Sequence, residues 1–140
     1  MKATFLALVA AVVVTVAPAK ASTILARIDI SEQQMQVFVN GWPTYTWPVS
    51  TARRGYVTPV GSYRAQRLAA MWYSRKYDNS PMPHSIFFKG GYAIHGTGYV
   101  KNLGKPASHG CVRLHPDNAT TLFSLVKDNG MENMFVEVVQ

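Results

Sequence analysis

Residues 34–50, QMQVFVNGWPTYTWPVS, contain the pattern that decides the fold. Apolar residues occupy every second position from Met35 to Val39, which is the period of a strand with one buried face. Asn40-Gly41 follows, and this dipeptide is the strongest short signal for a β-hairpin. Pro43 and Pro48 cannot donate to a strand ladder, so we expect the second arm at a sheet edge or interrupted there.

Further extended segments lie on both sides of this hairpin. They are short, rich in β-branched and aromatic residues, and separated by Gly and Pro: residues 24–30, 62–67, 85–88, 92–95 and 134–139. Such spacing favours an all-β sandwich or barrel over parallel βαβ units. The predicted fold class is therefore mostly β, a β-sandwich with one packing helix.

That helix is expected near the C-terminus. After Pro116, apolar residues recur at i, i+3, i+4 and i+7, namely at Ala119, Leu122, Phe123 and Val126. Pro116 and Asp117 suit a first turn, Lys127 suits a last turn, and Gly130 supplies the stop. The apolar stripe is predicted to cover one end of the sheet.

The N-terminus has the features of a secretory signal peptide. A positively charged start precedes the apolar run at 5–17, and the small-residue pattern Ala19-Lys20-Ala21 predicts cleavage before Ser22. An uncleaved membrane anchor is the alternative. We expect a signal peptide at 1–21, one domain at 22–140, and export to the periplasm or cell envelope.

The net charge of the exported chain excludes few classes of partner, but it favours some of them over others. Removal of Lys2 and Lys20 from the 14 basic residues leaves 12 against 7 acidic ones, a net charge of +5. Such a charge favours acidic polymers or surfaces, although solubility alone would also explain it. There is no basic run, zinc-finger spacing or helix-turn-helix signal, so nucleic acid is not expected as a partner.

The single cysteine, Cys111, is the candidate nucleophile. A lone cysteine in an exported chain cannot form an internal disulfide, so it is either inert and buried or reactive. A reactive thiol needs a base or a cation nearby, and His95, His109, Arg113 and His115 are candidates. Gly110 lets the backbone approach a substrate carbonyl, so that neighbouring amides could stabilise an oxyanion.

Three other interpretations of these residues stay open. Cys111 with His95, His109 and His115 could bind zinc, although His-x-Cys lacks the spacing of structural zinc sites. Cys111 could be a packing residue of the core. His95 could be a core histidine whose hydrogen bonds are satisfied.

The segment IHGTGYVKNLGKPASHGCVRL, residues 94–114, resembles the active-site segment of the L,D-transpeptidase (YkuD-type) family, in which His-Gly precedes a Ser-His-Gly-Cys block. Here His95 precedes Cys111 by sixteen residues. The resemblance extends to VSTARRGYVTPVGSYR (49–64), which lacks the family's glycine after Ser-Thr, and to MPHSIFFKGGYAIHG (82–96). Arg113 stands where some members have asparagine.

The resemblance implies a β-sandwich enzyme that acts on the stem peptides of peptidoglycan. Cys111 would attack the carbonyl before the terminal D-alanine of a tetrapeptide stem and hold the peptide as a thioester. His95 would be the base, His109 would orient the substrate or the thiolate, and Ser108 would fix the loop. The amides around Gly110 and Cys111 would bind the oxyanion. Arg113 is the further candidate for substrate binding.

The resemblance leaves the second half of the reaction open. The acyl acceptor would be the amine of a neighbouring stem, or that of an outer-membrane protein or lipoprotein, in a monomeric enzyme without metal or cofactor. The alternatives are an L,D-carboxypeptidase that hydrolyses the same stems, and a wall-binding module without catalysis.

Two expectations concern details of the site. Residues 67–84, RLAAMWYSRKYDNSPMPH, are expected to form either a lid over the donor stem or a partly buried surface loop. His95 is expected to have its other ring nitrogen held by a backbone carbonyl and, as an imidazolium, to depress the pKa of Cys111.

Overall fold

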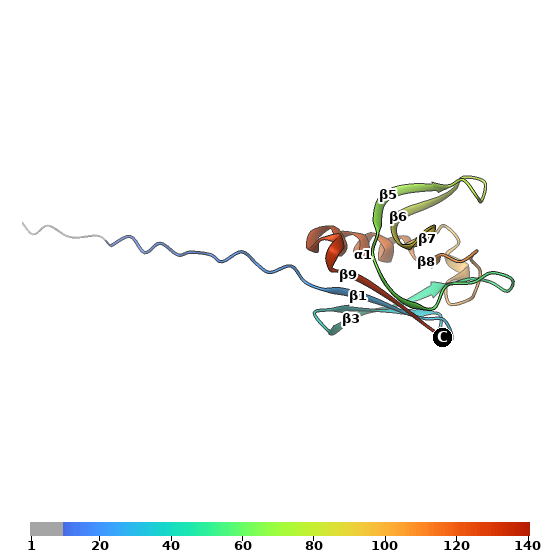
Figure 1. Ribbon diagram of the computed structural model, residues 1–140, viewed down its shortest axis with the longest axis horizontal. Helices are drawn as coiled ribbons and strands as arrows, with labels where there is room; N and C mark the ends of the chain where they lie inside the picture. Colours follow the sequence, from blue (N-terminus) through green and yellow to red (C-terminus); the bar gives the residue numbers. More distant parts are fainter. Residues whose placement is uncertain (1–9) are drawn as a thin grey trace, which may run out of the picture.

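The computed structural model describes residues 10–140. Residues 10–21 are exposed and contain neither helix nor strand, and they extend away from the folded domain (Figure 1). Residues 1–9 of the predicted signal peptide lie outside the described part of the chain. Within the described range, no helix has the length and apolar character needed to cross a membrane.

The predicted hairpin is confirmed. β2 (Gln34–Val39) pairs with β3 (Trp42–Ser50) in antiparallel orientation. Asn40 and Gly41 connect them with φ angles of 50° and 80°, as a tight hairpin turn requires. β1 (Ile24–Asp29) pairs antiparallel with the other side of β2.

Nine strands of the described residues form one curled sheet in the order β4-β9-β1-β2-β3-β8-β7-β6-β5. The remaining strands are β4 (Gly61–Arg64), β5 (Arg67–Ser74), β6 (Ser80–Lys89), β7 (Tyr92–Gly96), β8 (Val112–Leu114) and β9 (Met134–Val139). The pairs β1 with β9 and β7 with β8 are parallel, and the other pairs are antiparallel. The mostly β class is confirmed.

The edge expected for the second hairpin arm is present along most of β3. Only Val49 and Ser50 pair with β8, so residues 42–48 contact a neighbouring strand on the β2 side alone. Both prolines pair with β2 and lie where the other side of β3 has no neighbouring strand, and such an edge tolerates residues without an amide hydrogen. The end of β3 thereby joins the two halves of the sheet.

The expectation that residues 67–84 form a loop is wrong, because β5 and β6 form an antiparallel hairpin there. Most of β5 is exposed on both faces, so its sequence lacks the alternation that reveals a strand. Pro81 and Pro83 lie within β6, and prolines in a sequence argue against a strand. The hairpin projects beyond the rest of the sheet and ends in the turn between β5 and β6 (Figure 1).

The predicted helix is confirmed as α1 (Pro116–Asn129), which ends at Gly130. Its buried residues are the four of the predicted stripe, Ala119, Leu122, Phe123 and Val126. They pack on β6 and β7 and contribute to a core that also contains buried residues of β1, β2 and β9. Short 3-10 turns lie at Val100–Asn102 and Met131–Asn133.

Candidate active site

Cys111, His95 and Arg113 are placed on one face by the parallel pairing of β7 with β8. In that register His95 lies opposite Arg113 and Ile94 lies opposite Val112. Ile94 and Val112 are buried in the main core, and successive side chains of a strand point to opposite faces. His95, Arg113 and Cys111 therefore face away from that core, and Cys111 packs on a small cluster around Ala93.

The Cys111 thiol is partly buried and neutral in its resting state. Its Sγ lies 3.8 Å from the carbonyl oxygen of Gly91, to which the thiol donates. Burial raises the pKa of Cys111, and this effect outweighs the Ala93 amide and the Arg113 charge, which both favour the thiolate. Cys111 has intermediate exposure, so part of its surface reaches solvent while the rest packs on the cluster around Ala93.

His95 is buried and held in one orientation. Only 6% of its surface is exposed, and Nδ1 lies 2.7 Å from the carbonyl oxygen of Gly96. A carbonyl only accepts, so Nδ1 carries the proton and Nε2 has a free lone pair. This confirms the expected carbonyl partner.

The expectation that His95 is an imidazolium is wrong. Burial lowers the pKa of His95 from 6.5 to about 4, against the Gly96 hydrogen bond, which raises it, and Arg113 adds to the lowering. Desolvation penalises the charged ring more than one neutral carbonyl can compensate. His95 is a neutral imidazole at neutral pH, and the pKa of Cys111 is raised instead of depressed.

Ser108 organises the loop that carries the cysteine. Its Oγ accepts from the Gly110 amide at 3.0 Å and donates to the Cys111 carbonyl oxygen at 2.6 Å. The Ser108 amide donates to Thr51, and the Arg53 amide donates to the Ser108 carbonyl. The loop before β8 is therefore tied to the loop after β3.

Gly110 has a conformation and a packing that only glycine fits. Its φ is +137°, and an added Cβ would lie 2.6 Å from Cε1 of Tyr92 and 2.9 Å from the carbonyl oxygen of Val57. Its amide is occupied by Ser108. Of the two amides that the sequence suggested as oxyanion donors, the Cys111 amide is thus the remaining candidate.

The sequence did not single out the residues that support this loop. Thr58 donates to the Gly110 carbonyl at 2.8 Å, and buried Gln33 donates to Thr51 Oγ1 at 2.6 Å and accepts from the Thr51 amide at 3.0 Å. Thr58 lies in residues 49–64, which resemble the known family, so the sequence could have indicated its importance. Gln33 lies in the β1–β2 turn, and nothing local distinguishes it from a surface residue.

His109 lies between two tyrosine rings. Its ring centroid is 4.1 Å from that of Tyr77 and 4.7 Å from that of Tyr56. Tyr77 belongs to the turn between β5 and β6, and Tyr56 belongs to the loop between β3 and β4. Partial burial, followed by nearby positive charges, holds the pKa of His109 below its usual range; the charges are those of Arg53, Arg113 and Lys76.

The zinc interpretation gains no support from the placement of the histidines. His115 is the N-cap of α1, where its Nδ1 accepts from the Asp117 amide at 3.1 Å. Among residues 10–140 there is no group of three or more His, Cys, Asp or Glu side chains that could hold a metal ion. The fourth histidine, His84, lies 3.3 Å from Thr120 on α1.

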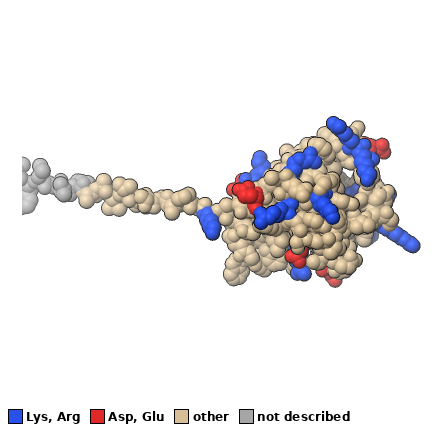
Figure 2. All heavy atoms as spheres, in the orientation of Figure 1, with Lys and Arg blue, Asp and Glu red and all other residues tan. Residues whose placement is uncertain are grey.

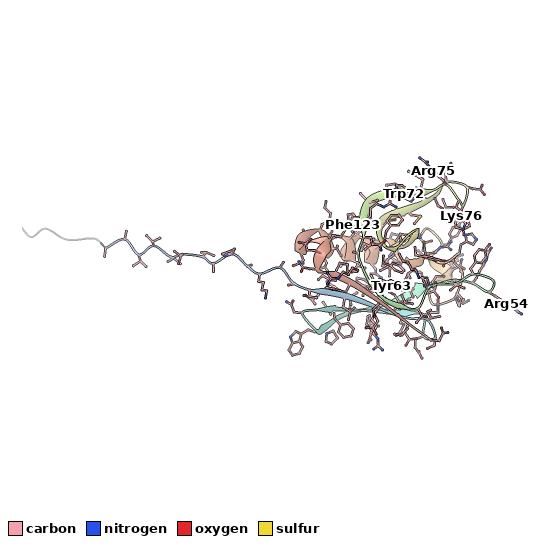
Figure 3. The ribbon with its side chains drawn as sticks, in the orientation of Figure 1. Arg54, Tyr63, Trp72, Arg75, Lys76 and Phe123 are labelled. Atoms are coloured by element: carbon pink, nitrogen blue, oxygen red, sulfur yellow. The ribbon has the colours of Figure 1, made fainter. Side chains whose placement is uncertain are left out.

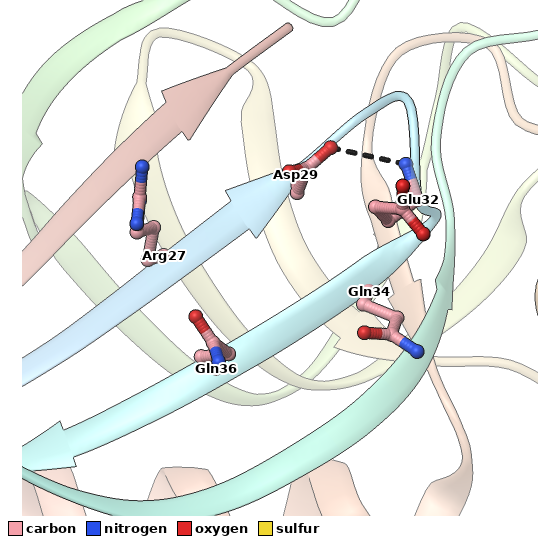
Figure 4. A pocket seen from close by; sticks show the side chains of 5 residues that line it. All are labelled: Arg27, Asp29, Glu32, Gln34 and Gln36. Carbon is pink, nitrogen blue, oxygen red and sulfur yellow. Dashed lines mark hydrogen bonds between the residues drawn. The ribbon is translucent and has the colours of Figure 1, made fainter.

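A polar hollow of about 260 Å³ lies on the outer face of β1 and β2, away from these residues (Figure 4). Arg27, Asp29, Glu32, Gln34 and Gln36 line it. Asp29 accepts from the Glu32 amide at 3.0 Å and from Ser31, and these bonds lower its pKa. None of the candidate catalytic side chains contributes to this hollow.

Comparison with known proteins gives one family match. The L,D-transpeptidase catalytic domain (YkuD) matches residues 24–138. An L,D-transpeptidase structure from Mycobacterium smegmatis is 22% identical, with a TM-score of 0.75 over 85% of this chain and 59% of that one. An L,D-transpeptidase from Stackebrandtia nassauensis is 26% identical, with a TM-score of 0.73 over 84% of this chain and 56% of that one.

L,D-transpeptidase 3 from Mycobacterium tuberculosis, in complex with a faropenem-derived adduct, is 20% identical, with a TM-score of 0.71 over 85% of this chain and 61% of that one. This chain spans less than two thirds of the length of each of these three structures. No curated protein sequence matches it.

Proposed function

Because this chain belongs to the L,D-transpeptidase catalytic domain family, we propose that Cys111 is the nucleophile of a transpeptidase that acts on the tetrapeptide stems of peptidoglycan. The observation that carries the proposal is the shared face of β7 and β8, where the neutral His95 lies in β7 and the protonated Cys111 immediately precedes β8. A neutral imidazole can take a proton, and a thiol of raised pKa needs a base that does so.

The first half of the reaction forms the acyl-enzyme. As Sγ of Cys111 attacks the carbonyl before the terminal D-alanine, Nε2 of His95 accepts the thiol proton. The carbonyl oxygen becomes an oxyanion, which the Cys111 amide stabilises. The carbon–nitrogen bond then breaks, His95 returns the proton to the leaving amine, and D-alanine departs from a thioester on Cys111.

The second half transfers the acyl group to an amine. An amine of a neighbouring stem, or of an outer-membrane protein or lipoprotein, attacks the thioester and loses a proton to His95. An amide forms and the Cys111 thiol is regenerated. Export to the periplasm or cell envelope, where these substrates occur, is part of the proposal and rests on the predicted signal peptide.

The test is incubation of the purified protein with tetrapeptide-stem fragments, with and without an amine acceptor, and identification of the products by mass. We expect release of D-alanine and a new amide-linked product. Transfer to water alone would indicate the carboxypeptidase, and the absence of both products would refute the enzyme.

A covalent probe assigns the nucleophile. Faropenem or a carbapenem should add a single mass to the wild type and none to Cys111→Ala. His95→Gln should slow acylation by at least about a hundredfold, within the usual contribution of a general base, whereas His115→Gln, a matched change outside the site, should not. An adduct on Cys111→Ala would exclude Cys111 as the nucleophile.

A further inference from the structure

Positive charge is concentrated in the part of the chain that builds the site. Between residues 50 and 115 there is one acidic residue, Asp78, against ten basic ones: Arg53, Arg54, Arg64, Arg67, Arg75, Lys76, Lys89, Lys101, Lys105 and Arg113. The rest of residues 22–140 has two basic residues, Arg27 and Lys127, against six acidic ones. The two parts therefore differ in the sign of their charge, +9 against −4.

Two pairs of these basic residues lie at the tips of separate loops. Arg53 and Arg54 belong to the loop between β3 and β4, and Arg75 and Lys76 belong to the turn between β5 and β6. Lys and Arg side chains project from the end of the domain opposite the N-terminal tail (Figure 2), and Arg54, Arg75 and Lys76 lie at that end (Figure 3).

Both tips are anchored beside the nucleophile through His109. The Arg53 guanidinium lies 5.1 Å from the centroid of Tyr56, and the Lys76 ammonium lies 5.5 Å from that of Tyr77. These two rings contact His109, Tyr77 in a stacked and Tyr56 in a tilted arrangement. His109 is two residues from Cys111, a span of about 7 Å in extended chain. The two loops therefore reach the segment that carries Cys111 through different rings.

In the described part of the chain, these four cations have no carboxylate within ion-pair distance. Among residues 10–140, the ion pairs are Arg27 with Glu137 and His115 with Asp117, and neither includes a loop-tip cation. Uncompensated surface charges attract ligands of opposite sign over a Debye length of about 8–10 Å. The charges of Arg53 and Lys76 already act on His109, whose pKa they help to lower, so an acyl donor bound beside His109 lies within their field.

We propose that Arg53 and Arg54 on one loop and Arg75 and Lys76 on the other form a two-sided cationic clamp that selects acidic peptides as acyl donors. The inference rests on the proposed function and adds a substrate class to it. Stem peptides carry carboxylates besides the terminal one, and amidation removes their charge without changing the backbone. Donors with free carboxylates are preferred over their amidated counterparts.

An acidic peptide fits this arrangement better than a general polyanion of the wall. A polymer attracted only by surface charge would need no cations beside the nucleophile, and it would leave the choice of donor unchanged. Here one cation of each loop, Arg53 or Lys76, lies over a tyrosine ring that contacts His109, so its field acts on a peptide bound beside His109. The clamp therefore acts mainly on kcat/KM for the donor.

The experiment measures kcat/KM for a tetrapeptide donor with free non-terminal carboxylates and for the same donor with these groups amidated, at about 50 and 300 mM salt. The wild type should prefer the free acid by about fivefold at low salt, and the preference should shrink at high salt. Arg54→Gln/Arg75→Gln, a change at two exposed positions, should reduce the preference at least twofold, mainly through a lower kcat/KM for the free-acid donor.

The control is Arg27→Gln/Lys127→Gln, which removes the same net charge outside the site and should keep the wild-type preference. Equal turnover of both donors by the wild type, or an undiminished preference in Arg54→Gln/Arg75→Gln, would overturn the clamp while leaving the transpeptidase intact. A preference lost equally in the control would show that net charge alone is responsible, which also overturns it. Failure of the proposed function is distinguishable, because then neither donor is turned over.

Discussion

Protonation of His95 should make the stability of the domain sensitive to acid. The ring is 6% exposed, and burial lowers its pKa from 6.5 to about 4. Because the folded-state pKa is depressed, the unfolded chain binds the proton more readily between pH 6.5 and pH 4. Stability is therefore fully present above pH 6.5 and is lost as the pH falls towards 4.

The size of this loss in unfolding free energy follows from the lowering of the His95 pKa. The difference of about 2.5 pKa units, at 1.36 kcal/mol per unit, corresponds to a loss of about 2 kcal/mol between pH 7 and pH 5 and about 3 kcal/mol by pH 4. Domains of this size have unfolding free energies of roughly 5–15 kcal/mol, so the loss is readily measured.

The assay is urea unfolding of the wild type and of His95→Gln at several pH values from 7 to 4. The glutamine variant is expected to be less stable at pH 7, because it loses the bond to Gly96, but its free energy should fall less steeply with acid. His115→Gln leaves His95 in place and should keep the wild-type slope. Parallel slopes for wild type and His95→Gln would refute the argument, since His95 would then not be buried as a neutral base.

Two further predictions concern the thiol and the N-terminus. Alkylation of Cys111 by iodoacetamide should have a pH midpoint above the usual range of a free thiol, because burial raises the pKa of Cys111. Arg113→Gln should raise this midpoint further, because the Arg113 charge favours the thiolate. A wild-type midpoint below that of free cysteine would contradict a neutral Cys111 beside a neutral His95. The envelope-extracted protein should begin near Ser22, because the apolar run ends in Ala19-Lys20-Ala21; N-terminal sequencing that finds Met1 retained would disprove cleavage.

Local signals predicted most of the secondary structure. The hairpin at Asn40-Gly41 and the helix after Pro116 depend on turn chemistry and on periodicity, which neighbouring residues supply by themselves. The β5–β6 hairpin was missed because β5 is largely exposed and the first half of β6 contains Pro81 and Pro83. A strand that buries neither face does not require alternating apolar and polar residues, so its sequence does not show the strand pattern.

The sequence by itself determined which residue types form the candidate site: one cysteine in an exported-type chain, a glycine before it, and histidines at a spacing that resembles a known family. The tertiary structure decided their states and partners. Burial made His95 neutral and raised the pKa of Cys111, where residue types alone had suggested an ion pair. Contacts between distant segments placed His109 between Tyr56 and Tyr77. Desolvation and stacking depend on what surrounds a side chain in space, and residues far apart in the chain supply those surroundings.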